Sequence, residues 1–147
     1  MKTLNEMHLH FPSVSINESF ARAAVAAVAG QLDPTLDELC DLKTAVSEAV
    51  TNAIIHGYQD TIGVVYIDCR ILPDSTIQVR VRDRGCGIAD IQKAMEPLYT
   101  TSGSERAGLG FAVMKSFTDK LRVQSRLGVG TTVFMEKTFS PRVRCNG

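Results

Sequence analysis

The sequence lacks the hydrophobic segments that would place it in a membrane or direct it out of the cell. Its first residues, Met1 to Glu6, contain no apolar run of the kind that a signal peptide requires. No apolar run elsewhere is long enough to span a bilayer. We therefore expect a cytoplasmic protein that does not associate with a membrane.

The sequence also has few cysteines and no excess of either charge. None of the four cysteines forms a Cys-x-x-Cys pair or lies near a histidine cluster, which disfavours zinc and favours a reducing compartment. They are Cys40, Cys69, Cys86 and Cys145. The 16 basic and 16 acidic residues cancel without long blocks of one sign, so we expect no direct binding to nucleic acid.

A chain of 147 residues, 44% of them hydrophobic, is suited to one domain with a substantial core. We expect that domain to span residues 1–139 and residues 140–147 to form a disordered tail. Alternating polarity over Met7–Phe11 predicts a strand. Helical spacing of apolar residues predicts a helix from Asn17 to about Gln31. Its recurring apolar residues are Phe20, Ala24, Ala27 and Val28.

A second helix has clear signals for both of its ends. Thr35 and Glu38 have the spacing of a capping box, in which each residue satisfies the other's backbone N–H. Gly57 is a plausible stop, because glycine adopts the left-handed end conformation without strain. The apolar stripe between them consists of Leu39, Leu42, Val46, Val50 and Ala53.

The second half of the chain reads mainly as strands. Two of them, 64–72 and 77–83, flank a turn too short for a parallel crossover. A helix is predicted over Gly110–Phe117, with Phe111, Met114 and Phe117 facing inward, and a last hairpin pairs 122–124 with 131–139. This order predicts an α+β fold: a two-layer sandwich with a mixed, mostly antiparallel sheet and helices on one face.

The first candidate site motif lies on the second helix. Glu48, Asn52 and His56 are four residues apart and share one side, away from the apolar stripe. This could be an ordinary solvated face. It could also be a site for a hard cation, in which Asn52 offers a carbonyl oxygen to Mg²⁺ and Glu48 accepts a proton.

The second motif is Asp83-Arg-Gly85-Cys-Gly87 at the end of a strand. Ile77, Val79 and Val81 alternate onto one face, and Asp83 continues that apolar row. A buried carboxylate is costly unless it is hydrogen-bonded, and a purine amino group would satisfy it. The alternative is a simple strand-ending turn.

The third motif is glycine-rich and precedes a helix, from Gly103 through Arg106 and Gly108 to Gly110. Backbone N–H groups at a helix N-terminus, together with an arginine, can bind phosphate. A flexible surface loop would look the same. The stretch is not a P-loop, because Leu109 stands where that motif needs lysine, and the glycines at 85 and 87 lack the third glycine of the dinucleotide fingerprint.

Taken in order, these motifs resemble the N box, G1 box and G2 box of the Bergerat ATPases, over residues 7–139. Ser47-Glu-Ala-Val-Thr-Asn-Ala-Ile-Ile-His-Gly57 is similar to the anti-sigma serine kinases of Gram-positive bacteria. Three further stretches, residues 17–22, 31–35 and 97–101, resemble the members of that family found in spore formers. The resemblance implies the Bergerat fold and a homodimer that binds ATP and Mg²⁺. It also implies a sigma factor as the inhibited partner and a serine of an anti-anti-sigma protein as the substrate.

The resemblance also assigns a role to each matching residue. Glu48 would be the catalytic base, Asn52 would hold Mg²⁺, and Asp83 would read adenine. Arg106 would reach the terminal phosphate, and Arg22 would lie on the partner surface. The remaining pocket residues implied by the match are Gly85, Gly87, Thr101, Gly108, Leu109 and Gly110.

Three alternatives remain open at this point. A histidine-kinase catalytic domain has the same boxes but should follow a helix pair that carries the phospho-accepting histidine, and no such pair is present. A gyrase or MutL ATPase needs a much longer chain. An ATP-gated binding switch without significant kinase activity would have the same sequence features.

Overall fold

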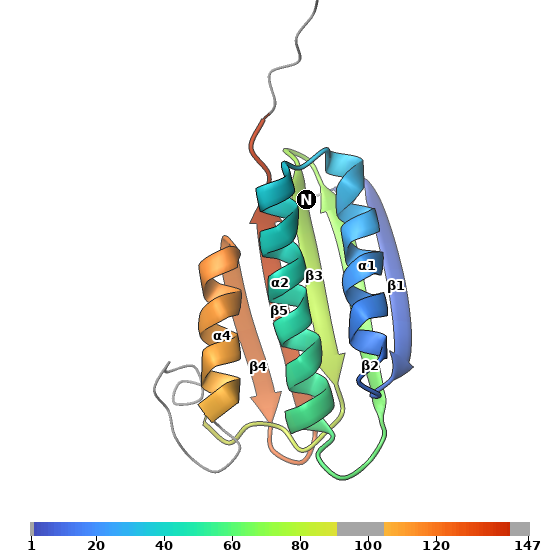
Figure 1. Ribbon diagram of the computed structural model, residues 1–147, viewed down its shortest axis with the longest axis vertical. Helices are drawn as coiled ribbons and strands as arrows, with labels where there is room; N and C mark the ends of the chain where they lie inside the picture. Colours follow the sequence, from blue (N-terminus) through green and yellow to red (C-terminus); the bar gives the residue numbers. More distant parts are fainter. Residues whose placement is uncertain (1, 91–104, 142–147) are drawn as a thin grey trace, which may run out of the picture.

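The computed structural model describes residues 2–90 and 105–141, with the side chains of 105–109 excepted. One layer is a five-stranded sheet and the other is formed by helices (Figure 1). All four pairings are antiparallel, which confirms the α+β sandwich and makes this sheet antiparallel throughout rather than mixed. In sheet order the strands are β1 (Asn5–Pro12), β2 (Val64–Leu72), β3 (Thr76–Asp83), β5 (Gly130–Thr138) and β4 (Lys120–Arg126).

The helices cover one face of the sheet. The helices are α1 (Asn17–Ala29), α2 (Leu36–Asn52) and α4 (Glu105–Phe117). In Figure 1, α1 lies on the side of β1 and β2, α2 over the middle of the sheet, and α4 on the side of β4. The opposite face of the sheet is covered by no helix in the described ranges. None of these helices is both long and apolar enough to cross a bilayer.

The N-terminus of α2 forms as predicted. Glu38 donates its backbone N–H to Thr35 Oγ1 at 3.1 Å, and Thr35 donates its own to Glu38 Oε1 at 3.0 Å. Such a cap contributes about 1 kcal/mol to helix stability. The second Glu38 oxygen accepts the backbone N–H of Ser140 at 2.8 Å, which ties the start of the expected tail to α2. Of the predicted stripe, Leu42, Val46, Val50 and Ala53 are buried.

The predicted helix α1 is confirmed, but the apolar residues whose spacing predicted it are not its most buried ones. Phe20 is 58% exposed, whereas Ala21, Val25 and Ala29 are fully buried. Apolar residues occur on more than one side of this helix, so spacing alone could not identify the inward side. Small side chains at 21, 25 and 29 let α1 lie close to α2 and the sheet, as dense interior packing requires.

The two hairpins follow the predicted order. Asp74 and Ser75 have φ angles of 64° and 55°, the two positive values that a type I′ turn between β2 and β3 needs. The last hairpin turns through Gly128 and Gly130, both at positive φ. Phe111 and Met114 of α4 are buried against the sheet, and Phe117 packs at the edge of the core, as predicted.

Candidate functional site

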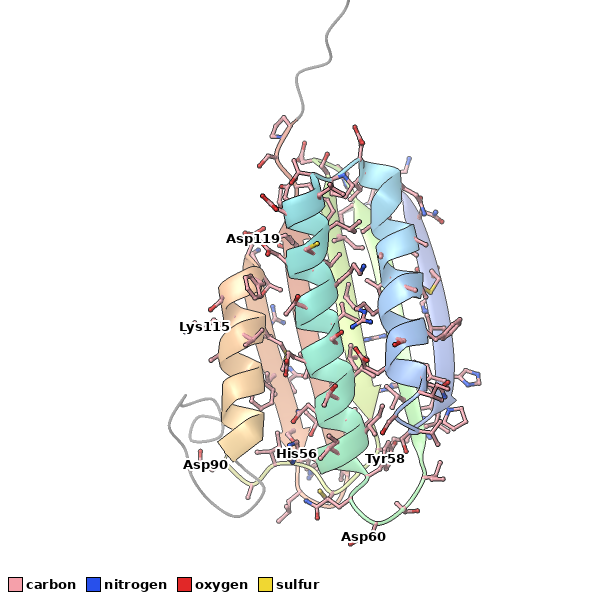
Figure 2. The ribbon with its side chains drawn as sticks, in the orientation of Figure 1. His56, Tyr58, Asp60, Asp90, Lys115 and Asp119 are labelled. Carbon is pink, nitrogen blue, oxygen red and sulfur yellow. The ribbon has the colours of Figure 1, made fainter. Side chains whose placement is uncertain are left out.

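Three segments meet at one end of the molecule: the end of α2, the loop after β3, and the β4–β5 turn. His56 and Tyr58 mark this end in Figure 2, with Asp90 on the same side near α4. The helical run ends at Gly57, as predicted, but Gly57 is not in the predicted left-handed conformation. The run finishes as a π-helical turn over Ala53–Gly57, closed by the backbone N–H of Tyr58 on the carbonyl of Ala53 at 3.1 Å. Such turns are frequent at functional sites.

Asp83 lies on the buried side of β3, as strand alternation predicted, and is 5% exposed. Burial raises the pKa of its carboxyl above the ordinary value, and the backbone N–H groups of Gly85 and Thr131 oppose that rise. Gly85 donates to Asp83 Oδ1 at 2.9 Å. The fold therefore keeps a carboxylate in a place that disfavours its charge, which is typical of a ligand-binding group.

Gly57 and Gly85 are needed because backbone segments touch beside this carboxylate. A Cβ on Gly85 would lie 1.9 Å from the carbonyl oxygen of Gly57. That oxygen instead accepts the backbone N–H of Cys86 at 2.9 Å. The Tyr58 hydroxyl joins the segments by donating to the Val64 carbonyl and accepting the Arg84 N–H, both at 2.7 Å. Tyr58 was not predicted to take part, and Gly57 was predicted only to end the helix.

Gly87 fixes the other side of the same loop. Its φ is 76°, and an added Cβ would lie 2.2 Å from the Arg126 carbonyl oxygen. The residue is thus required both for its backbone conformation and for the close approach of β4.

Gly57→Ala should weaken nucleotide binding more than it weakens the fold. The new methyl would lie 2.8 Å from the Asp83 Cγ and Oδ1, so the carboxylate must move. We expect ATP affinity to fall about tenfold or more, measured by calorimetry, because a displaced acceptor loses a buried hydrogen bond of about 1–3 kcal/mol.

Gly30→Ala is the matched control for that substitution. A Cβ at Gly30 would meet nothing within 4 Å, and its φ is −57°. This variant should bind ATP normally and be slightly more stable, since alanine restricts the unfolded chain. Equal ATP affinity in Gly57→Ala and in the unsubstituted chain would contradict a role for this contact.

Asn52, at the end of α2, does not lie on a solvated face. Its side chain is 8% exposed, and its Oδ1 has no hydrogen-bond partner among the described residues. An unpartnered buried carbonyl oxygen costs free energy, so its presence suggests a ligand. His56 lies in the π-helical turn. The α-helical periodicity that would place it on the same side as Glu48 and Asn52 is interrupted there.

Glu48 is half-buried and faces α4. A Cβ added to Gly110 would lie 3.1 Å from Glu48 Oε2, so the two helices are close at this point. Helix α4 begins at Glu105 rather than at the predicted Gly110, which puts Gly108 and Gly110 inside the helix instead of before it. The close approach to Glu48 gives glycine a reason at position 110 despite its cost of about 1 kcal/mol in a helix.

Several predicted residues lie outside what the structure describes. Thr101 is outside the described residues, as is the tail beyond 141, and for Arg106 and Leu109 only the helical backbone is described. The single domain over 1–139 therefore stays a prediction. The structure brings Glu48, Asn52, Asp83, Gly85 and Gly87 to one end of the molecule.

Arg22 lies apart from this end, between α1 and α2. Its Nη1 donates to Glu18 Oε1 and to Ser47 Oγ, both at 3.2 Å, and Ser47 donates to Glu18 at 2.5 Å. Ser47 precedes Glu48 in the chain, so the Arg22 cluster is one residue from the candidate site. Neither Glu18 nor Ser47 was predicted to take part, although both lie in the stretches that carry the resemblance.

Comparison with known proteins assigns the family. The chain matches the histidine kinase-like ATPase domain family over residues 14–137. It is 51% identical over 145 residues to the anti-sigma F factor of Geobacillus sp. (strain WCH70), covering 97% of this chain and 99% of the relative. It is 54% identical over 137 residues to that of Clostridium acetobutylicum, covering 92% and 95%. The chain belongs to the histidine kinase-like ATPases and, within them, to the family of the anti-sigma F factors.

Solved structures give the same fold at lower identity. The RsbU and RsbW domains of Rv1364c from Mycobacterium tuberculosis align with a TM-score of 0.69 at 18% identity, over 95% of this chain and 34% of that one. The histidine kinase domain of Erythrobacter litoralis EL346 aligns with a TM-score of 0.57 at 20% identity, over 83% and 60%. At these identities the likeness concerns the fold alone.

Proposed function

We propose that this protein is an ATP-dependent anti-sigma factor and protein serine kinase. It binds and inhibits a sporulation sigma factor, and it phosphorylates a serine of an anti-anti-sigma partner. It acts as a cytoplasmic homodimer, with Arg22 on the partner surface. The names of its relatives support the first part, and the histidine kinase-like ATPase domain supports the use of ATP.

The observation that carries the proposal is the buried carboxylate of Asp83 beside Gly57. A carboxylate that accepts a hydrogen bond from the amino group of adenine distinguishes ATP from GTP, which presents a carbonyl oxygen at that position. Glycines at 57, 85 and 87 keep side chains away from the carboxylate and its loop. The N-terminal turn of α4, which includes Arg106 and Gly108, would supply N–H groups and positive charge for the phosphates, and Gly110 lies further along the helix beside Glu48.

Asn52 fits the Mg²⁺ that such a reaction uses. No cluster of three or more His, Cys, Asp or Glu side chains that could hold a metal occurs among the described residues. Mg²⁺ does not need such a cluster, because it keeps waters and phosphate oxygens as ligands and takes one or two from the protein. The unpartnered Oδ1 of Asn52 is an oxygen of the required kind. When bound, the ion would neutralise charge on the phosphates.

Glu48 is the proposed acceptor of the serine hydroxyl proton. The partner's serine oxygen forms a bond to the γ-phosphorus while the bond to the ADP oxygen breaks, and the hydroxyl proton passes to the Glu48 carboxylate. Glu48 is four residues before Asn52 on α2, so the base and the metal ligand lie on one side of a rigid helix. Half-burial leaves the carboxylate accessible to a substrate hydroxyl.

The test of this proposal is phosphate transfer from γ-labelled ATP, with the protein alone and with a candidate anti-anti-sigma protein. Label on a partner serine supports the kinase. Label on the protein itself, at histidine, would support a histidine-kinase-type domain. Binding of ATP and sigma factor without transfer would reduce the protein to an ATP-gated switch. Co-purification with an untagged sigma factor tests the inhibited partner.

Asn52→Ala should remove the Mg²⁺ dependence of ATP binding. We expect wild-type ATP affinity to fall sharply in EDTA and the variant's affinity to be low under both conditions, since the variant lacks the ligand oxygen. Thermal stability without nucleotide should change little, because removing an unsatisfied buried polar atom offsets the loss of packing. Asn5→Ala, at an exposed position of β1, is the control. A variant with normal Mg²⁺-dependent affinity would exclude Asn52 as the ligand.

A further inference from the structure

The uncovered face of the sheet has an ordered pattern of charge. Cross-strand register arranges its outward side chains in rows that run from β1 to β4. The first row is Glu6, Arg70, Gln78, Glu136 and Lys120. The second row is His8, Asp68, Arg80, Phe134 and Arg122. The third row is His10, Tyr66, Arg82, Thr132 and Gln124.

All the acidic side chains in these rows lie in the first two, and each pairs with a base. Glu136 lies 3.3 Å from Lys120, and Glu6 lies 3.8 Å from Arg70. Asp68 accepts two hydrogen bonds from Arg80 and also contacts His8. The two acids of the first row are therefore neutralised by its two bases, and in the second row Asp68 is neutralised while Arg122 has no ion pair among the described residues.

The other half of the face, toward the candidate nucleotide site, is basic. Arg82 lies in the third row, and Arg84 and Arg126 lie just beyond it. In the part of the chain that the structure describes, none of the three has an ion pair with a carboxylate. The three arginines line a hollow of about 420 Å³ together with residues of β4, β5 and the turn between them, and its lining also includes Asp83 at the end of β3. We call this surface the arginine hollow.

The arginine hollow presents guanidinium groups rather than ring faces. The guanidinium groups of Arg82 and Arg84 lie over the Tyr66 ring, at 4.8 and 5.1 Å from its centroid. The Phe134 ring in the neighbouring row is covered in the same way by Arg122, at 5.3 Å. Stacking holds a guanidinium in place and leaves its N–H edge for carboxylates or phosphates. The Arg82 Nε–H is buried and has no hydrogen-bond partner among the described residues, so the terminal nitrogens of these arginines are the groups offered to a partner.

These observations favour a protein partner over a nucleic acid. Single-stranded nucleic acid binds through bases stacked on aromatic rings as well as through its phosphates, and here the two nearest rings are occupied by arginine. The chain also has no net charge, so it lacks the long-range attraction typical of nucleic-acid-binding domains. Carboxylates need only the guanidinium edges, which they bind in pairs.

We propose that the arginine hollow is a docking site for an acidic segment of a partner protein. The outward arginines are on the face of the sheet opposite the helices that carry Glu48 and Asn52, and the hollow borders the candidate nucleotide site at Asp83. This inference goes beyond the proposed kinase activity and does not depend on it.

The test uses a fluorescent peptide of eight glutamates, in saturating Mg·ATP and at about 0.15 M salt. Wild-type protein should bind it, and Arg84→Gln with Arg126→Gln should weaken binding roughly fivefold or more, because each exposed charge pair is worth a factor of about two to five. Both side chains are exposed, so the double variant should fold normally. Adding Arg82→Gln should weaken binding further.

The matched control removes two positive charges from the neutralised first row: Arg70→Gln with Lys120→Gln. It should change peptide affinity less than twofold. An equal loss in both double variants, or no binding by the wild type, would overturn the proposal. Tighter binding of an oligothymidylate of the same charge would identify a nucleic-acid surface instead. Weaker peptide binding in saturating Mg·ATP than without nucleotide would assign the hollow to the nucleotide site. A fluorescent ATP analogue, measured on the same variants, reports separately on the proposed function.

Discussion

Glu48→Gln is expected to slow phosphate transfer to the partner by roughly 100-fold or more while ATP and sigma binding remain normal. The substitution keeps the shape of the side chain but removes the group that accepts the serine proton, and general bases contribute about 10²–10⁴-fold. The measurement is single-turnover transfer from γ-labelled ATP, with nucleotide affinity measured by calorimetry on the same sample.

Asp41→Asn supplies the control for charge. It removes one carboxylate from the same helix, seven residues earlier, and should transfer phosphate at the normal rate. If Glu48→Gln also transfers at the normal rate, Glu48 has a structural role, and its closeness to Gly110 is the contact to examine.

Asp83→Asn is expected to lower ATP affinity and, at the same time, to stabilise the protein without nucleotide. The amide cannot match the adenine amino group in the way the carboxylate does, so binding should weaken by about 1–3 kcal/mol. The wild type should discriminate strongly against GTP. Calorimetry with both nucleotides measures the change in affinity. Equal ATP and GTP affinities in the wild type would exclude Asp83 as the residue that recognises adenine.

The stabilising effect of Asp83→Asn should depend on pH in a defined direction. Burial raises the pKa of the Asp83 carboxyl in the folded state above its ordinary value of 3.8. At a pH above the folded pKa, the buried negative charge therefore lowers the free energy of unfolding. This destabilisation is lost as the pH falls through the folded pKa toward 3.8. At pH 7 the variant should be more stable by roughly 1 kcal/mol, or about 2–4 °C in Tm. The difference should disappear near pH 4.

Asp60→Asn controls for both effects. Asp60 is exposed in the loop before β2, at the same end of the molecule as Asp83 (Figure 2). Its substitution should change neither ATP affinity nor Tm. A purely structural role for Asp83 predicts that Asp83→Asn lowers stability, which is the opposite of the expected result.

The sequence was sufficient to predict features that depend on local chemistry or on strand alternation. The capping box of Thr35 and Glu38 and the bounds of β2 follow from neighbouring residues alone. The burial of Asp83 follows from the alternation of Ile77, Val79 and Val81 before it. The family resemblance then brought separate motifs into one site, which no local pattern could have done.

The features that were predicted wrongly depend on contacts between distant segments. The role of Gly57 depends on Asp83 and Gly85, which are 26 and 28 residues later, so the end of α2 looked like an ordinary glycine stop. Helix α4 starts at Glu105 despite two glycines, because helix packing outweighs local propensity. The inward side of α1 depends on how closely it packs against α2, which small residues on several sides leave undetermined in the sequence.

The position of β5 in the sheet affects how the protein is made. Although it is the last strand in the chain, β5 lies between β3 and β4 and pairs with both. Its residue Thr131 lies opposite Asp83 and helps to enclose that carboxylate. A nascent chain on the ribosome therefore exposes the free edge of β3 until β5 has emerged, and it cannot bind nucleotide before then. Pairing between segments so distant in sequence is slow. The free edge of β3 is therefore most exposed to aggregation, and most in need of a chaperone, before β5 has paired with it.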